Sequence, residues 1–307
     1  MPASRLATPG TGSLAGWTVT YVRAGGLNLR VARRGEGPAL LLLTGIGANV
    51  EMWTPLVRLL DDRELIAVDA PGTGLSQRPL LPLRMGGLAR TMVALLDELG
   101  LPEVDVLGYS FGGLLAQELA HLAPTRVRRL ILCAIAQGTF VVPPRPVPAL
   151  LLLTPARYYH PRLFRLITPH IAGGRTRREP EALERQAAAR LARPPDLLGY
   201  AYQLYASCWF TSLPWLHRIR PPTLILAGDD DPIIPVANPR LMARLLPDAD
   251  LRVVPGAGHL FLLDEPERVI GEIRAFLARG ERTNEDEHTA LAARRVGWTP
   301  ATRARSG

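Results

Sequence analysis

The stretch GYSFGG, residues Gly108–Gly113, decides how the rest of the chain is interpreted. It directly follows the apolar run Val104–Tyr109 and opens a helical pattern over Phe111–His121. A sharp turn from strand to helix crowds the backbone, so glycine is needed on both sides while Ser110 projects outward. The helix N-terminus also offers free N–H groups and positive potential, which suit a developing negative charge. Ser110 is therefore predicted to be a catalytic nucleophile.

Short apolar runs alternate with helical patterns on both sides of this stretch. The runs are continuous in apolar character, as in strands that are covered on both faces of a mostly parallel sheet. Thr18–Ala24 and Leu27–Arg33, separated by Gly25 and Gly26, predict an opening hairpin. The remaining patterns predict strands at Ala39–Leu43, Leu65–Asp69, Val104–Tyr109, Val127–Ala134, Thr223–Ala227 and Leu251–Val254, and helices at Met52–Leu60, Met85–Leu99, Phe111–His121, Pro239–Leu246 and Pro266–Leu277. An α/β fold with helices on both faces of the central sheet follows.

The strand and helix rhythm stops at Gln137 and resumes at Thr223. A helical insertion explains this better than two sequential domains, so we expect a core of residues 17–136 and 217–279 with a lid of residues 137–216. Residues 1–16 and 280–307 are expected to be a flexible N-terminus and a flexible tail. Most aromatic side chains of the insertion are expected to pack its own small core; they are Phe140, Tyr158, Tyr159, Phe164, Tyr200, Tyr202, Tyr205, Trp209, Phe210 and Trp215.

A serine hydroxyl is a weak nucleophile unless a base removes its proton. Of the six histidines, only His259 follows the last strand of the α/β array, within the stretch GAGHLF at Gly256–Phe261. The small residues that precede it allow this loop to approach the edge of the sheet. We therefore expect His259 to be the base.

The base must in turn be oriented by a carboxylate, which also stabilises its cation. Asp229, Asp230 and Asp231 follow the strand Thr223–Ala227 directly. We favour Asp231, because the turn ends at Pro232 and the last acid should point towards the histidine loop; Asp229 is the next choice. The order Ser, Asp, His along the chain is the order found in α/β hydrolases.

An oxyanion hole needs two N–H donors. One is expected from Phe111, and the other from Ile46 in the loop that follows Ala39–Leu43. That loop also begins like a dinucleotide fingerprint at Gly45 and Gly47, but Val50 stands where the third glycine would fall. A phosphate site is therefore not expected, and Asp69 is interpreted as an acid at the end of a strand, not as a ribose ligand. No Cys and His spacing suggests a metal, so no cofactor is expected.

The chain carries a net charge of +8, and all 36 basic residues are arginine. These arginines are scattered, so nucleic-acid binding is not expected, while contact with an anionic granule or membrane surface stays open. Cys133 and Cys208 suggest no disulfide framework. No apolar run approaches the length that spans a bilayer, and the first sixteen residues do not resemble a secretory signal. A cytoplasmic location is expected.

Taken together, these stretches resemble the intracellular depolymerases of medium-chain-length poly(3-hydroxyalkanoates). The likeness runs from Thr18 to Leu277 and is strongest at Gly45–Asn49, Gly108–Gly113, Trp209–Pro235 and Gly258–Leu262. The resemblance implies an α/β-hydrolase fold and a triad of Ser110, Asp231 and His259, the residues chosen above. The family carries Val and Trp at the positions of Tyr109 and Phe111, so the pocket beside the nucleophile is expected to differ.

The resemblance also implies a function. Ester bonds of the polymer would be cleaved through an acyl-serine, with release of 3-hydroxyalkanoic acids or oligomers and without a cofactor. The expected partner is a hydrophobic ester or polyester, at the surface of a storage granule. Substrate contacts are expected from Asn49, Tyr109, Trp209, Phe210 and Trp215. Two alternatives stay open: a general carboxylesterase or lipase-like hydrolase of small or lipid esters, and a hydrolase-fold binding protein without turnover.

Overall fold

One sheet of eight strands forms the centre of the computed structural model, which describes residues 16–139, 142–191 and 193–279. Its order is β1-β2-β4-β3-β5-β6-β7-β8. The strands are β1 Thr18–Ala24, β2 Leu27–Arg34, β3 Ala39–Leu43, β4 Glu64–Val68, β5 Val104–Tyr109, β6 Val127–Cys133, β7 Thr223–Gly228 and β8 Ala249–Val254. Strand β2 pairs antiparallel with β1 and β4, and all other pairs are parallel. The predicted hairpin and mostly parallel sheet are both present.

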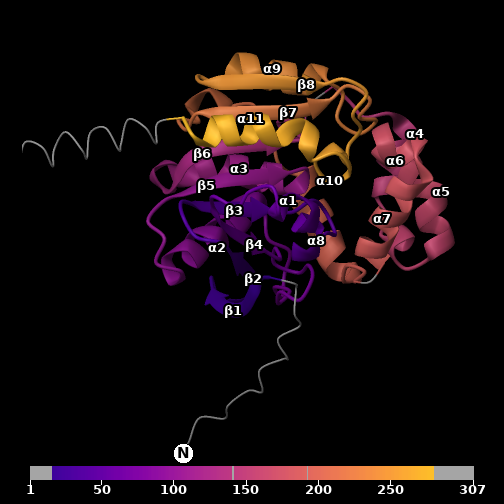
Figure 1. Ribbon diagram of the computed structural model, residues 1–307. Helices are drawn as coiled ribbons and strands as arrows, with labels where there is room; N and C mark the ends of the chain where they lie inside the picture. The colour runs from indigo at the N-terminus through magenta and orange to yellow at the C-terminus, as the bar shows by residue number, and fades with distance from the viewer. Residues whose placement is uncertain (1–15, 140–141, 192, 280–307) are drawn as a thin grey trace, which may run out of the picture.

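Two apolar layers cover the sheet, one on each face (Figure 1). The strand side chains alternate between them, with Leu41 and Leu43 in one layer and Leu40 and Leu42 in the other. This is why β3, at the centre of the sheet, is apolar at every position. The first layer contains α2 Met85–Glu98, α3 Phe111–Leu122 and α9 Ala237–Leu245; the second contains α1 Thr54–Val57, α10 Phe261–Asp264 and α11 Glu267–Leu277.

Two helices differ from the sequence-based expectation. The helix predicted over Met52–Leu60 is a short 3-10 turn at Val50–Trp53 followed by α1. The N–H groups of Leu59 and Leu60 bond to carbonyls three residues earlier, so the α-helical bonding ends early. The four-residue helix α10, which begins two residues after His259, was not predicted because it is too short to show a helical period.

Five α-helices of the described chain lie between β6 and β7. They are α4 Pro146–Leu152, α5 Pro161–Ala172, α6 Gly174–Arg178, α7 Pro180–Leu191 and α8 Leu197–Cys208. Helices α4 to α7 stand together beyond one end of the sheet (Figure 1). Tyr158, Phe164 and Tyr200 form a small core of their own with Ala187. The predicted terminal segments lie outside the described residues apart from Gly16, as does Phe140.

The turn between β5 and α3 depends on glycine for reasons of packing. A Cβ at Gly112 would lie 2.1 Å from the carbonyl oxygen of Leu43 on β3. Because backbone atoms cannot move aside cheaply, we expect Gly112→Ala to lower the free energy of unfolding by about 2–3 kcal/mol. Chemical denaturation measures this. The control is Gly271→Ala on α11, where nothing lies within 4 Å of the new Cβ. It should raise the free energy of unfolding by about 0.5–1 kcal/mol. Equal effects of the two substitutions would show that the close contact at Gly112 does not matter for stability.

Candidate active site

Ser110 occupies the turn between β5 and α3 in a backbone conformation that is unusual for a residue with a side chain. Its φ is 52° and its ψ is −119°, a region that costs about 1–3 kcal/mol outside glycine. The surrounding structure holds this conformation: the Ser110 N–H donates to the Cys133 carbonyl at 3.0 Å, and the Ser110 carbonyl accepts from the Gly113 N–H at 2.7 Å. The result is a serine hydroxyl that projects beyond the carboxyl end of β5 into a cavity.

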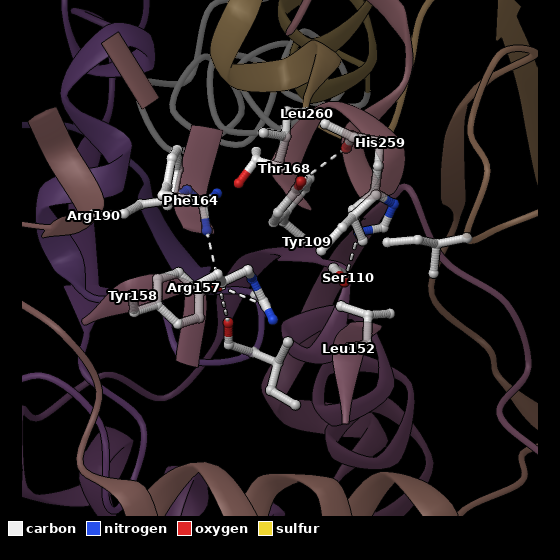
Figure 2. Close-up of a pocket in the computed structure, with 15 residues that line it drawn as sticks. Tyr109, Ser110, Leu152, Arg157, Tyr158, Phe164, Thr168, Arg190, His259 and Leu260 are labelled. Carbon is white, nitrogen blue, oxygen red and sulfur yellow. Dashed lines mark hydrogen bonds between the residues drawn. The ribbon is translucent and has the colours of Figure 1, made fainter. Parts of the chain in front are cut away.

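Three side chains from three separate loops form a continuous hydrogen-bonded chain. Figure 2 shows its bond between His259 and Ser110. The Nε2 atom of His259 lies 3.0 Å from the Ser110 Oγ, and its Nδ1 atom lies 2.7 Å from the Asp231 Oδ2. The other carboxylate oxygen of Asp231 accepts the N–H groups of Ile233 and Ile234 at 2.8 and 2.9 Å. The loop after β7 thus fixes the carboxylate, which in turn orients the imidazole towards the serine.

The three consecutive acids after β7 have three different partners. Asp229 accepts the Gly256 N–H at 2.5 Å and so fastens the start of the histidine loop. Asp230 faces the insertion, where it accepts the Gly174 N–H at 2.9 Å and pairs with Arg177 at 2.7 Å. Asp231 alone among them bonds to the imidazole of His259. The geometry favours Asp231 over Asp229 as the orienting acid.

The backbone of His259 is held from two sides. Its carbonyl accepts the Tyr109 hydroxyl at 2.8 Å, and its N–H donates to the Ala172 carbonyl at the end of α5. Burial, the largest cause, raises the pKa of Tyr109 well above its usual range, so the hydroxyl stays a neutral donor. Gly258 packs so closely here that a Cβ would lie 2.2 Å from the Ala172 carbonyl oxygen. The insertion therefore contacts the histidine loop directly.

The insertion also holds the loop that carries Ile46. The Ile46 carbonyl accepts the Tyr158 hydroxyl at 3.4 Å, and the next N–H, that of Gly47, donates to the Gln203 Oε1 at 2.8 Å. The carbonyl and the N–H of the peptide between Ile46 and Gly47 are thus both hydrogen-bonded to side chains of the insertion. Ile46 lines the same cavity as Ser110. Phe111 begins α3, where the first N–H groups have no acceptor within the helix, while its side chain is buried in the core.

The cavity in front of Ser110 encloses about 550 Å³ of empty space, part of it open to solvent. Its wall combines residues of the sheet loops with residues of α4, α5, α7 and the turn at Arg157 and Tyr158. The lining residues are Gly45, Ile46, Tyr109, Ser110, Leu152, Arg157, Tyr158, Phe164, Thr168, Ile171, Ala172, Arg190, Ile233, His259 and Leu260. Most of the wall is apolar, with a few polar groups, as is usual for a small-molecule site.

Of the five expected substrate contacts, only Tyr109 lines this cavity. Asn49 lies outside it, with its Nδ2 atom 3.5 Å from the Arg193 carbonyl. Trp209 is 73% exposed, Phe210 is buried in the main core, and Trp215 stacks on His121 with ring centroids 4.1 Å apart. The expected set is corrected accordingly: the chain after α8 runs back to the sheet, so these aromatic side chains pack beside α3 or face solvent.

Four polar lining residues were missed by sequence reasoning: Arg157, Tyr158, Thr168 and Arg190. Tyr158 is among the aromatic side chains expected to pack the insertion's own core, and it does belong to that core. The other three sit among many arginines and threonines with no motif around them. No local pattern could distinguish them, because only the packing of the insertion brings them to the cavity.

Asp69 has a structural role. It is fully buried at the end of β4, where it accepts the Val50 N–H at 2.7 Å and the Leu75 N–H at 2.9 Å and pairs with Arg30 at 3.3 Å. Burial raises the pKa of Asp69 to about 6. This agrees with its interpretation as an acid at a strand end. In the described ranges, no cluster of three or more His, Cys, Asp or Glu side chains could hold a metal ion.

Comparison with known proteins identifies similar sequences. The family described as the α/β hydrolase fold matches residues 38–266. A poly(3-hydroxyalkanoate) depolymerase of Ectopseudomonas oleovorans is 45% identical over 239 residues, which cover 78% of this chain and 83% of that protein. A 3-oxoadipate enol-lactonase of Acinetobacter baylyi is 28% identical, over 82% of this chain and 93% of that protein.

Among solved structures, a thermophilic esterase from Thermogutta terrifontis superposes with a TM-score of 0.71. The two sequences are 27% identical, and the match covers 85% of this chain and 98% of that one. The predicted α/β-hydrolase fold class is confirmed.

Proposed function

This chain belongs to the α/β-hydrolase fold family, among the poly(3-hydroxyalkanoate) depolymerases, and from that premise we propose that it hydrolyses medium-chain-length poly(3-hydroxyalkanoate) with Ser110, His259 and Asp231. Because it belongs to this family, the protein is a serine ester hydrolase. The observation that carries the catalytic assignment is the hydrogen-bonded chain from the Ser110 Oγ through His259 to Asp231, at 3.0 and 2.7 Å.

The proposed mechanism passes through an acyl-serine. Ser110 attacks the ester carbonyl while His259 Nε2 takes its proton, and Asp231 stabilises the resulting imidazolium. The N–H groups of Ile46 and Phe111 are proposed to stabilise the oxyanion. His259 then protonates the departing alkoxide, which leaves as the hydroxyl of a 3-hydroxyacyl unit. A water molecule, activated by the same imidazole, releases the acid from Ser110.

The wall of the cavity supports an apolar acyl substrate. Leu152, Phe164 and Ile171 from the insertion face the same space as Ile233 and Leu260 from the sheet loops. Alkyl side chains of a medium-chain polyester gain roughly 0.8 kcal/mol for each buried CH₂ group in such a site. We further propose that residues 137–216 act as a lid, because much of the cavity wall comes from them.

We also propose that the protein acts at a polymer granule in the cytoplasm, and helix α4 supports the contact with the granule. Each of its seven residues is apolar, and one of them, Leu152, lines the cavity. Its outer side is nevertheless exposed, with Val147 at 62% and Leu150 at 67%. An apolar helix beside the cavity mouth suits contact with a hydrophobic polymer surface. None of the helices in the described ranges has the length and apolarity that crossing a membrane requires.

Polar substitutions on α4 should separate polymer from soluble substrate. We expect Val147→Ser with Leu150→Ser to lower the ratio of polymer to soluble-ester activity by about a hundredfold, because each of the two lost apolar contacts weakens adsorption by about 1.5 kcal/mol. Release of 3-hydroxyoctanoate from a polymer emulsion is compared with hydrolysis of p-nitrophenyl octanoate. Leu122→Ser, at the far end of α3 and 38% exposed, is the matched control; a ratio unchanged in the α4 variant would argue against docking through this helix.

The second candidate function is a general carboxylesterase, which the similarity to the Thermogutta esterase favours. A depolymerase and a general carboxylesterase differ in whether they release hydroxy acids from the polymer. An enzyme that hydrolyses p-nitrophenyl octanoate rapidly but liberates no 3-hydroxyoctanoate from the emulsion would be a general esterase. Multiple turnovers on either substrate would exclude a binding protein without catalysis.

A further inference from the structure

Two polar groups on the cavity wall have no protein partner in the described part of the chain. They are the Thr168 Oγ1 on α5 and the Arg190 Nη2 on α7, and both atoms are buried. Thr168 is only 6% exposed, and both residues line the cavity that contains Ser110. Leaving a buried donor unpaired is unfavourable by about 1–3 kcal/mol. Unpaired donors on the wall of a substrate cavity indicate a position where the substrate supplies the acceptor.

The charge of this wall indicates the kind of acceptor. Arg157 is 4% exposed and also lines the cavity, yet its hydrogen bonds go to the carbonyls of Leu151 and Thr154 and to two tyrosine hydroxyls, all neutral. Arg190 donates to the Gln186 Oε1 at 3.2 Å and to the Tyr158 hydroxyl at 3.5 Å, which are neutral too. Among the described residues, no carboxylate lies within ion-pairing distance of either guanidinium.

One acid acts on Arg190 from further away. It is Asp264, whose two carboxylate oxygens are occupied by the hydroxyl of Thr176 and, at 2.8 Å, by the Nε2 of Gln186. The positive charge of this wall changes the pKa of the Tyr158 hydroxyl. Burial alone would raise that pKa, but the nearby Arg157 and Arg190 lower it below its usual value. The wall is therefore electropositive and suited to an anion.

We propose that Arg190 and Thr168 form a subsite for the free carboxylate at the end of a 3-hydroxyacyl chain. This inference rests on the proposed function and names the part of the substrate that the site selects. The enzyme then removes units from the carboxyl end of the polymer. Figure 2 shows Arg190 on the far side of the pocket from Ser110, and Tyr158 and Arg157 lie nearer to Ser110 than Arg190 does.

The spacing suits a chain end. From the Arg190 Nη1, a hydrogen bond of 3.5 Å reaches the Tyr158 hydroxyl, and another of 3.4 Å leads on to the Ile46 carbonyl. The carboxylate subsite is thus two hydrogen bonds away from the loop that carries the proposed oxyanion donor. In a dimer of a 3-hydroxyalkanoate, four covalent bonds separate the scissile carbonyl carbon from the free carboxyl carbon. Ser110 and Arg190 line the same cavity, so the scissile carbonyl and the free carboxylate are proposed to occupy it together.

The reaction at a chain end then balances in two steps. The Ser110 Oγ forms a bond to the penultimate carbonyl carbon, and the bond from that carbon to the ester oxygen breaks. The terminal 3-hydroxy acid leaves with its carboxylate held by Arg190 and its new hydroxyl protonated by His259. Water then attacks the acyl-serine and releases a chain shortened by one unit, with a new free carboxylate.

A pair of dimers tests the proposal. Steady-state kcat/KM is measured for the 3-hydroxyoctanoate dimer with a free carboxylate and for its methyl ester, which removes the charge. We expect the wild-type enzyme to prefer the free acid by about ten- to a hundredfold, the range of a charged hydrogen bond. In Arg190→Met the two substrates should differ by less than about threefold, and Thr168→Val should reduce the preference in part. A merely structural role of Arg190 would lower both values together and leave their ratio intact.

Arg185→Met is the matched control, because Arg185 lies on the same helix but lines an outer groove and not this cavity. It should keep the wild-type preference. Equal values of kcat/KM for acid and methyl ester in the wild type would overturn the subsite while leaving ester hydrolysis intact. A preference that responds to acetylation of the 3-hydroxyl end, and not to the methyl ester, would overturn it in favour of a hydroxyl subsite. Turnover of p-nitrophenyl octanoate with no turnover of either dimer would instead defeat the proposed function.

Discussion

Ser110→Ala is expected to lower kcat on p-nitrophenyl octanoate by about 10⁴-fold or more, because among the described residues Ser110 is the nucleophile bonded to the His259 imidazole. The hydroxyl lies 3.0 Å from the His259 Nε2, and alanine removes the only atom that connects the imidazole to the substrate carbonyl. The fold should persist, since the N–H and carbonyl of residue 110 keep their bonds to Cys133 and Gly113.

The control for this variant is Ser207→Ala. Ser207 lies on α8 and its hydroxyl bonds to the Gln203 carbonyl at 2.9 Å, away from the cavity. It should retain activity close to that of the wild type. Mass spectrometry after rapid quenching should find the acyl group on the peptide that contains residue 110 in the wild type and in Ser207→Ala, but not in Ser110→Ala. Substantial residual turnover by Ser110→Ala, with a folded protein and no contaminant, would remove the serine from the mechanism.

Asp231→Asn is expected to lower kcat by about 10³- to 10⁴-fold while preserving the fold. The amide oxygen can still accept the N–H groups of Ile233 and Ile234, so the loop after β7 keeps its shape. The amide nitrogen would then face the Nδ1 of His259 as a donor. That partner favours the tautomer with the proton on Nε2, which cannot accept the proton of Ser110.

Asp229→Asn is the matched control, since Asp229 is the alternative acid in the same turn and bonds to the Gly256 N–H. It should lose far less activity than Asp231→Asn. Steady-state kinetics of both variants decide between the two carboxylates. If Asp229→Asn shows the larger loss, the orienting acid has been assigned to the wrong residue.

Much of the architecture could be predicted because its signals are local. Strands β1, β3 and β5 begin and end at the predicted residues. β3 and β5 are short, mostly apolar runs, and β1 ends at the glycine pair Gly25 and Gly26. The turn at Ser110 was predictable for the same reason: the Gly pattern reflects crowding within a few residues of chain. The helix over Met52–Leu60 was wrong because its apolar period continues past the point where 3-10 bonding replaces the α-helix.

The sequence by itself determined the order of the elements, the sharp turn at Ser110, and the two loops from which a base and an acid could come. Only the tertiary structure brought Ser110 and His259, which are 149 residues apart, to a hydrogen bond, and gave Asp231, not Asp229, the bond to the imidazole. It also brought Thr168 and Arg190 to the cavity wall in place of the expected aromatic side chains. The physical reason is that strand and turn preferences act between near neighbours, whereas a cavity is lined by whichever side chains the packing of the insertion against the sheet turns towards it.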